Sequence, residues 1–423
     1  MTQISADTQP GAPPAPGAGG KQRRTEKFRT RQAAIMKTAV DLINRKGVRG
    51  MTLVDVAAEL DIGPTGVIYY FASKEELAAV CFLKAIEAYE ALIRAAAAAA
   101  TPAERLRRFV KGYVAQVRDV VRGARDPLAV FNDVRALNDP VVNLAYTNMF
   151  RSARGLLGPT PRRGPDRQVL NAVTHLLLSQ LFWSVVWLPL YDPEDYDRVA
   201  DRLLDVLENG VGAEGVAFSI GPSPPAATAS DDISRETFLR AATEIINEQG
   251  YLGASVDKIS ARLKVTKGSF YHHNDAKDDL VVACFRRTLD VMRRTQRLAI
   301  QRASDGWGQI SAATTSLVHC QVSGATPLLR TSALTSAPET MQSELVSGFD
   351  RISLNFASMI SDGIVDGSIR PVDAQVGAQM VTATINAAAE LQFWAPALPA
   401  EEAAAAYARA FLQGWRSVIS PPQ

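Results

Sequence analysis

Two short segments of the sequence carry side chains that could hydrogen-bond to phosphate oxygens and to base edges. The first, residues 64–74, contains Thr65, Tyr69, Tyr70 and Lys74. The second, residues 266–277, is richer in such groups and opens with the letters TKGSFYHH. Hydroxyl, amine and imidazole groups contact the phosphate backbone, and some of them also read base edges. Both segments therefore suit binding to a nucleic acid.

Catalytic and metal-binding chemistry has little support in the sequence. The four histidines are His175, His272, His273 and His319, and neither the spaced Cys/His sets of zinc sites nor a Gly-rich phosphate loop occurs. Cys320 follows His319, but no activating partner for a cysteine nucleophile is evident. We therefore expect no enzymatic activity, no cofactor and no metal.

A basic stretch precedes the first segment. Residues 21–49 hold ten Lys or Arg residues and only two acidic ones, Glu26 and Asp41. Such a patch displaces counterions from a polyanion, although a solvated basic tail has the same composition. Because this stretch leads into a predicted helix, nucleic-acid binding is favoured. The side chains that could follow the DNA backbone or enter the minor groove are Arg23, Arg24, Lys27, Arg29 and Arg31.

The sequence repeats itself once. Residues 35–82 align with residues 238–285 without a gap, 203 positions apart, and eleven of the 48 pairs are identical. The identical pairs include Asn44/Asn247, Gly47/Gly250, Gly50/Gly253, Leu60/Leu263, Lys74/Lys277 and Cys81/Cys284. A period this long exceeds that of solenoid repeats. It indicates a duplicated whole protein.

Each repeat has the pattern of several short helices. Apolar residues with helical spacing lead to a glycine, Gly47 or Gly250, that is suited to end a helix. Thr52 and Ser255 are then natural N-caps for a second helix. A turn of three to four residues and another short helix follow, over 64–70 and 267–273. Two short helices joined by a tight turn predict a helix-turn-helix.

Both copies resemble the DNA-binding module of the TetR/AcrR family of transcriptional regulators. The second copy is the closer match over residues 265–273, with Lys277 and Leu280, and departs at Asn274, where the family usually has Phe. In the first copy residues 71–77 fit well, but Pro64 replaces a polar residue and Ile68 stands where Tyr is common. The resemblance covers about 60 residues in each copy.

The resemblance implies an all-α protein made of two fused subunits, each a three-helix DNA-binding module followed by a helical regulatory body. Recognition-helix side chains would enter the major groove, and Lys74 and Lys277 would anchor phosphates. The implied DNA-binding residues are Thr52, Pro64, Thr65, Gly66, Tyr69, Tyr70, Lys74, Ser255, Thr266, Lys267, Gly268, Ser269, Tyr271, His272, His273 and Lys277. Because the first set is poorer in polar groups, the first module is alternatively a scaffold or a protein-interaction module.

The rest of the chain divides around these modules. We expect a disordered basic arm at 1–26 and DNA-binding domains at 27–88 and 231–291, with their helix-turn-helix near 52–71 and 255–274. Helical regulatory domains are expected at 89–210 and 292–423. A linker rich in Gly, Pro, Ala and Ser is expected between the copies, at 211–230. In the family the last two helices of each body pair subunits. The candidates are 165–188 with 193–207, and 372–394 with 401–418.

The expected partners are an operator in double-stranded DNA and a small-molecule effector of unknown identity. Phe131, Trp183, Trp187, Phe356 and Trp394 are weak candidates for an effector pocket, since each is also an ordinary core residue. The two halves could pair as an intramolecular pseudo-dimer, or two chains could form a homodimer. Repression is expected over activation, because the family mostly occludes promoters.

A cytoplasmic location without membrane insertion is expected. The amino terminus has no apolar run of the kind found in secretory signals. The longest apolar stretch, 176–191, is interrupted by polar residues and is short for a membrane span.

Overall fold

The computed structural model describes residues 18–159, 161, 164–218, 220–221, 233–264, 277–337 and 339–419. Throughout these ranges the regular structure is helical, and the one β-type pairing is an isolated bridge between Gly212 and Ile369. The all-α architecture expected from the sequence is confirmed.

The first half of the chain holds a small three-helix module and a body. The module consists of α1 (Ala18–Gly50), α2 (Leu53–Glu59) and α3 (Pro64–Ile68). The body consists of α4 (Lys74–Ala97), α5 (Pro102–Val121), η1 (Phe131–Leu137), α6 (Pro140–Leu156), α7 (Pro165–Trp187), η2 (Leu188–Leu190), η3 (Pro193–Asp195) and α8 (Tyr196–Asn209). Gly47 breaks α1 with φ 71° and ψ 169°, so the first helical run stops at the glycine that the sequence indicated.

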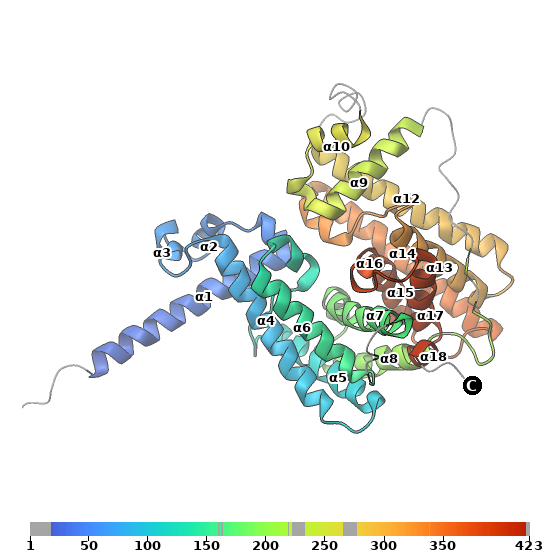
Figure 1. Cartoon of the computed structure of the whole chain (residues 1–423), viewed down its shortest axis with the longest axis horizontal. Helices are drawn as coiled ribbons and strands as arrows, with labels where there is room; N and C mark the ends of the chain where they lie inside the picture. The colour runs from blue at the N-terminus through green and yellow to red at the C-terminus, as the bar shows by residue number, and fades with distance from the viewer. Residues whose placement is uncertain are drawn as a thin grey trace, which may run out of the picture.

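The second half repeats this order. Its module contains α9 (Ile233–Gly253) and α10 (Val256–Leu263), and α12 (Lys277–Arg302) leads into the body. The body continues with α13 (Gly306–Ser323), η4 (Thr331–Ser336), α14 (Glu339–Asp366), α15 (Ala374–Ala387), η5 (Ala388–Glu390), α16 (Leu391–Trp394), α17 (Ala400–Leu412) and α18 (Arg416–Ile419). In Figure 1 the module of α1–α3 lies at the left, that of α9 and α10 at the top, and the bodies meet between them.

Details of the two modules match at equivalent positions. The turn after α2 places Asp61 in the left-handed region with φ 52°, and Lys264, 203 residues later, has φ 56° after α10. Cys81 Sγ donates to Met36 O at 3.8 Å, and Cys284 Sγ donates to Leu239 O at 3.7 Å. Burial raises the pKa of both thiols to about 12, so they stay protonated. Both cysteines are therefore structural.

Two expected boundaries differ from the structure. The arm expected to be disordered at 1–26 overlaps α1, which begins at Ala18, because Lys, Gln, Arg and Glu at 21–27 are good helix formers. The first part of the expected linker is docked on the second body instead of tethering freely. Trp307 Nε1 donates to Ala217 O at 3.0 Å, and Thr315 Oγ1 accepts from Gly221 N at 2.7 Å.

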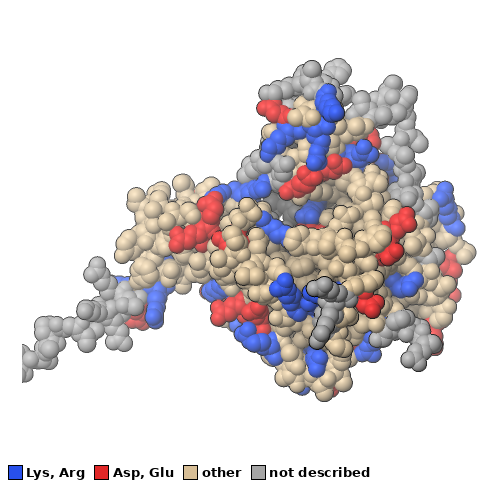
Figure 2. Space-filling model, in the orientation of Figure 1, with Lys and Arg blue, Asp and Glu red and all other residues tan. Residues whose placement is uncertain are grey.

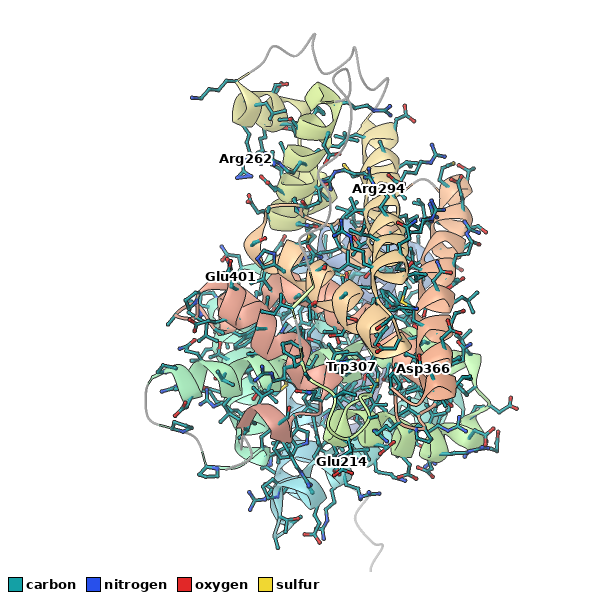
Figure 3. The ribbon with its side chains drawn as sticks, turned by 90° about the vertical axis from the view of Figure 1, so that its right-hand side faces the viewer. Glu214, Arg262, Arg294, Trp307, Asp366 and Glu401 are labelled. Atoms are coloured by element: carbon teal, nitrogen blue, oxygen red, sulfur yellow. The ribbon has the colours of Figure 1, made fainter. Side chains whose placement is uncertain are left out.

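Glycine makes this docking possible. Gly210 has φ 70°, and a Cβ there would lie 2.3 Å from Leu412 O. Beyond it, Val211 N donates to Leu412 O at 2.8 Å. Figure 3 shows Trp307 and Asp366 at the end of the second body where the docked segment carries Glu214. The docked segment is therefore attached to the surface of the second half, with Val211 buried and Glu214 exposed.

The helices at the centre join the two halves. α7 packs against α15 and α17, and α8 packs against α15. These helices lie in the segments predicted to pair the halves, although the predicted helix 372–394 is interrupted by η5. Within the described ranges one segment, Pro165–Leu190, is long and apolar enough to cross a membrane, and most of its apolar window is buried by protein. Its burial in the junction accounts for its composition.

Candidate nucleic-acid interface and the cavity between the halves

The first recognition helix, α3, exposes one face. Thr52 Oγ1 accepts from Asp55 N at 3.0 Å and so caps α2, and Val67 is fully buried beneath α3. Pro64 and Thr65 are exposed on the other side, and the Tyr69 side chain is 72% exposed. The helix therefore presents its polar and aromatic groups outward from a fixed base.

Aromatic packing supports the carboxyl end of α3. Phe28 of α1 lies with its ring centroid 4.7 Å from Tyr70 and 6.2 Å from Tyr69. Tyr69 and Tyr70 contact each other edge to face at 5.2 Å. Tyr70 is half-buried by these contacts, whereas Tyr69 keeps a free surface. Of the two tyrosines, Tyr69 is the better placed to reach a partner.

Lys74 has a structural partner. It begins α4, and its Nζ donates to the backbone oxygen of Arg49 at 3.3 Å, near the end of α1. Ser73 caps α4 by accepting from Glu76 N at 3.1 Å. The amine that the sequence assigned to a phosphate is thus half-buried between two helices. Gly66 is also half-buried, with its nearest neighbour in the side chain of Ile62.

Much of the second recognition segment lies outside the described residues. This applies to Thr266, Lys267, Gly268, Ser269, Tyr271, His272 and His273, and to the side chain of Lys277, although α12 begins there. Ser255 is described, and its Oγ accepts from Lys258 N at 3.3 Å as the cap of α10. In Figure 2 Lys and Arg side chains gather over the upper module of α9 and α10, while the end of the left module is mostly tan.

An asparagine joins each module to its body. Asn44 Nδ2 donates to Leu128 O at 3.0 Å, and Asn44 Oδ1 accepts from Val130 N at 2.9 Å. Asn247 repeats this arrangement with Leu328 O at 2.9 Å and Arg330 N at 3.0 Å. We call these two residues the asparagine clamps. The sequence indicated their importance only in that asparagine occupies the same position in both copies. Their partners lie more than 80 positions away and could not be inferred from the sequence.

The second module has an additional connection. Arg287 of α12 is buried, and its Nη2 and Nε lie 2.6 Å and 2.8 Å from Glu236 Oε1 on α9. Its Nη1 donates to Pro327 O at 2.7 Å. The equivalent positions of the first copy hold the exposed Lys84 and Ala33. The second module therefore has a buried ion pair that the equivalent positions of the first module lack.

Buried polar groups cross the junction between the halves. Gln180 Nε2 donates to Met380 O at 3.0 Å and to Thr384 Oγ1 at 2.9 Å. Asn171 Nδ2 donates to Trp394 O at 2.8 Å. At the rim, Arg202 pairs with Asp373, and Arg370 pairs with Asp205 at 2.9 Å. Such satisfied polar contacts within an apolar interface fix the register of the two halves.

A cavity of about 80 Å³ lies at this junction. It is lined by Phe131, Tyr146, Phe150, His175, Leu178, Ser179, Phe182 and Trp183 from the first half and by Arg330, Thr331, Ala383, Asn386, Ala387 and Glu390 from the second. Phe131 and Trp183 were pocket candidates from the sequence. Trp394 lies beside the cavity, stacked on Phe150 with centroids 3.6 Å apart.

The other two pocket candidates lie apart from this cavity. Trp187 is buried one turn beyond Trp183 and contacts Tyr191, with centroids 6.2 Å apart. Phe356 is fully buried on α14 in the second body. The lining residues Arg330, Asn386 and Glu390 were missed by sequence reasoning, because nothing in their local pattern indicates that they face the first half.

His175 at the junction gives an expected dependence of stability on pH. The histidine is buried and contacts Tyr407 OH through Nδ1 at 3.2 Å, and burial lowers its pKa to about 4. The unfolded chain binds a proton below about pH 6.5 whereas the folded chain does not, so the unfolding free energy should fall by about 3 kcal/mol between pH 6.5 and 4. His175→Gln should lose this part of the slope in urea unfolding measured at several pH values. An unchanged slope would contradict the assignment.

Comparison with known proteins identifies the repeated module. The sequence pattern of "Bacterial regulatory proteins, tetR family" matches residues 35–81 and again residues 238–284. The TetC protein of transposon Tn10 from Escherichia coli is 39% identical over 54 residues, which are 13% of this chain and 27% of that protein. The chain thus spans about a quarter of that relative's length.

Solved structures that are similar to part of this chain include a TetR family regulator and a complex with operator DNA. PfmR, a TetR family transcriptional regulator from Thermus thermophilus, is 20% identical with a TM-score of 0.36, covering 42% of this chain and 97% of its own. AibR in complex with isovaleryl coenzyme A and operator DNA is 19% identical with a TM-score of 0.34, covering 42% of this chain and 97% of its own.

Proposed function

We propose that this chain is a tandem TetR-family regulator that binds operator DNA sequence-specifically through two modules carried by one polypeptide. The observation that carries the proposal is the double family match, at residues 35–81 and 238–284, each followed by a helical body. A short helix such as α3, held on a buried base with an exposed face, is the form that enters a major groove.

We further propose that the chain acts as an intramolecular pseudo-dimer. The contacts of α7 and α8 with α15 and α17 supply the pairing that separate subunits would otherwise provide. The two recognition segments differ, with Pro-Thr-Gly-Val-Ile-Tyr-Tyr at 64–70 and Lys-Gly-Ser-Phe-Tyr-His-His at 267–273. Different side chains prefer different bases, so the operator would have two unlike half-sites. The alternative is a homodimer with four modules.

Roles for individual residues follow from exposure in the first module and from resemblance in the second. Thr65 and Tyr69 are accessible for base or phosphate contacts, with Pro64 and Gly66 shaping the helix start. Tyr70 would support this surface, and Lys74, which gives one N–H to the Arg49 carbonyl, keeps further N–H groups for a phosphate. In the second module we assign base or phosphate contacts to Thr266, Lys267, Gly268, Ser269, Tyr271, His272, His273 and Lys277, with Thr52 and Ser255 as caps that position each module.

A second candidate role is favoured for the first module by its surface. Ile68 is 50% exposed and Val54 is 61% exposed, which gives this module an apolar face that suits a protein partner. In this reading only the second module reads DNA, and the first is a scaffold. The regulator itself would act as a cytoplasmic, ligand-responsive repressor that occludes its promoter.

Variants of the two modules test these roles. Tyr69→Ala removes a side chain from the first module, and Lys277→Ala removes an amine from the second. If both modules bind, each change should weaken binding about tenfold, and Lys277→Ala should leave base preference unchanged because phosphate contacts position but do not read sequence. Mobility shift on the region upstream of the protein's own gene measures this, with Val186→Thr on the exposed face of α7 as the control. Full affinity of Tyr69→Ala would support the scaffold role.

A further inference from the structure

The cavity between the halves has two chemically different sides. The first half contributes a wall of aromatic rings, with Phe131 lying 5.1 Å from Phe182 and 5.1 Å from Tyr146 between centroids. The second half contributes a polar side, where Arg330 pairs with Glu390 at 3.0 Å. A ligand there would be mostly apolar with one polar end.

The charges at the cavity favour an anion. Among the described side chains, Arg135 and Arg330 are two cations against one carboxylate, that of Glu390, and these are the charges that act on His175 at the wall. His175 itself is neutral near pH 7, because burial lowers its pKa to about 4. Arg135 is further held over the ring of Phe393, 3.0 Å from its centroid. The described charges at the site therefore sum to one positive charge.

Buried donors at the cavity call for an acceptor. Among the residues that the structure describes, Trp183 Nε1 and Arg330 Nε, both on cavity-lining residues, are buried without a hydrogen-bond partner. Arg135 Nη2, close to Glu390, is likewise buried without a hydrogen-bond partner among the described residues. Buried donors without acceptors are costly, and a carboxylate that reached them after movement of the walls would lower this cost while matching the charge.

The size of the cavity limits the ligand. Its volume is about 80 Å³, and an apolar cavity of about 150 Å³ holds benzene. A single ring would therefore fit only with some movement of the half-buried walls formed by Phe182 and Trp183. Larger ligands would require the halves to separate.

The cavity is connected to both DNA modules. Phe131, on the aromatic wall, directly follows Val130, which is bonded to Asn44 of α1. Arg330, on the polar side, gives its own backbone N–H to Asn247 of α9. The adjoining η4 packs against both α9 and α1. A displacement of either wall would therefore reach the first helix of a module through an asparagine clamp.

We propose that this cavity is one effector site for a small apolar carboxylate, shared by the two halves, and that the asparagine clamps transmit its occupancy to both DNA modules. This deepens the regulatory role proposed above and rests on it only for the transmission step. The ligand must bind the DNA-competent and incompetent arrangements unequally for the signal to pass.

Binding is tested on the full chain without DNA, so that failure of the DNA-binding proposal does not obscure the result. Calorimetric titration with benzoate should give one site per chain, and benzyl alcohol, which has the ring without the carboxylate, should bind at least about tenfold more weakly. Two-ring 2-naphthoate should not bind. Ala387→Leu, which fills the cavity, should abolish benzoate binding, whereas Ala389→Leu, half-buried but not lining it, should keep it. No benzoate binding, or equal binding by both variants, would overturn the site.

Transmission is tested by titrating operator DNA with and without benzoate. Benzoate should change the DNA affinity of the wild-type chain by about fivefold or more. The double variant Asn44→Ala with Asn247→Ala should lose most of this change, while its affinity for benzoate stays within about twofold of the wild-type value. Asn355→Ala, which loses a hydrogen bond to Gln296 away from the clamps, is the control. Circular dichroism confirms that each variant is folded. If benzoate still changed the DNA affinity of the double variant as much as that of the wild type, the clamp mechanism would be overturned. If the chain bound benzoate but no DNA, the proposed function would be overturned and the ligand site would be upheld.

Discussion

Replacing Thr384 with arginine is expected to separate the two halves of the chain and to abolish tight operator binding. Thr384 is fully buried, and its Oγ1 donates to Met380 O at 2.7 Å and accepts from Gln180 Nε2 at 2.9 Å across the junction. A guanidinium buried there without a partner should cost about 4 kcal/mol or more. With the modules no longer held at a fixed spacing, operator affinity should fall by about a hundredfold or more.

Light scattering and DNA titration measure this outcome. The exposed apolar faces of α7 and α17 should also cause self-association of the variant. Thr384→Val is the matched control, because it keeps the shape of the side chain and leaves Gln180 its bond to Met380 O. A Thr384→Arg chain that remains monomeric and binds its operator with full affinity would show that the junction does not organise the DNA modules.

Arg287→Leu is expected to destabilise the second DNA module by about 4 kcal/mol, because it leaves the Glu236 carboxylate without its buried partner and removes the bond to Pro327 O. The duplication offers a matched control, since Lys84 occupies the equivalent position in the first half and is exposed. Lys84→Leu should change stability by less than about 0.5 kcal/mol.

Hydrogen exchange resolved by segment distinguishes the two variants. Arg287→Leu should raise exchange in α9 and α10 and leave α1 and α2 unchanged, since opening of one module need not unfold the other. Equal stability losses in both variants, or raised exchange in α1, would contradict the proposed difference in attachment.

The architecture could be predicted from the sequence because its signals are local and occur twice. Apolar spacing and the N-caps Thr52 and Ser255 depend only on neighbouring residues, and the repeat doubled the weight of each. The glycine signal was right only in the first copy, where Gly47 interrupts α1, whereas α9 continues through Gly250 to Gly253. The helices that join the halves could be named from the family resemblance, because in that family the last two helices of each body pair subunits.

The cavity could not be predicted, because its sides come from distant parts of the chain. Trp183 and Glu390 are 207 positions apart, and only the packing of α7 on α15 brings them to one place. The contact of Lys74 with the Arg49 carbonyl at 3.3 Å was equally hidden, because the family resemblance indicates only a phosphate contact, which stays a prediction. The docking of residues 211–221 depends on Trp307 and Thr315 far along the chain, whereas their own composition indicated a linker.

The mass of the protein–operator complex tests the central proposal most directly. Binding sites would first be selected from random duplexes, and the complex on the best site would be measured by light scattering. We predict one chain of 45.6 kDa for each duplex, on a site whose two half-sites differ and lie about one helical turn apart or a multiple of it. Two chains bound to a palindromic site would contradict the pseudo-dimer.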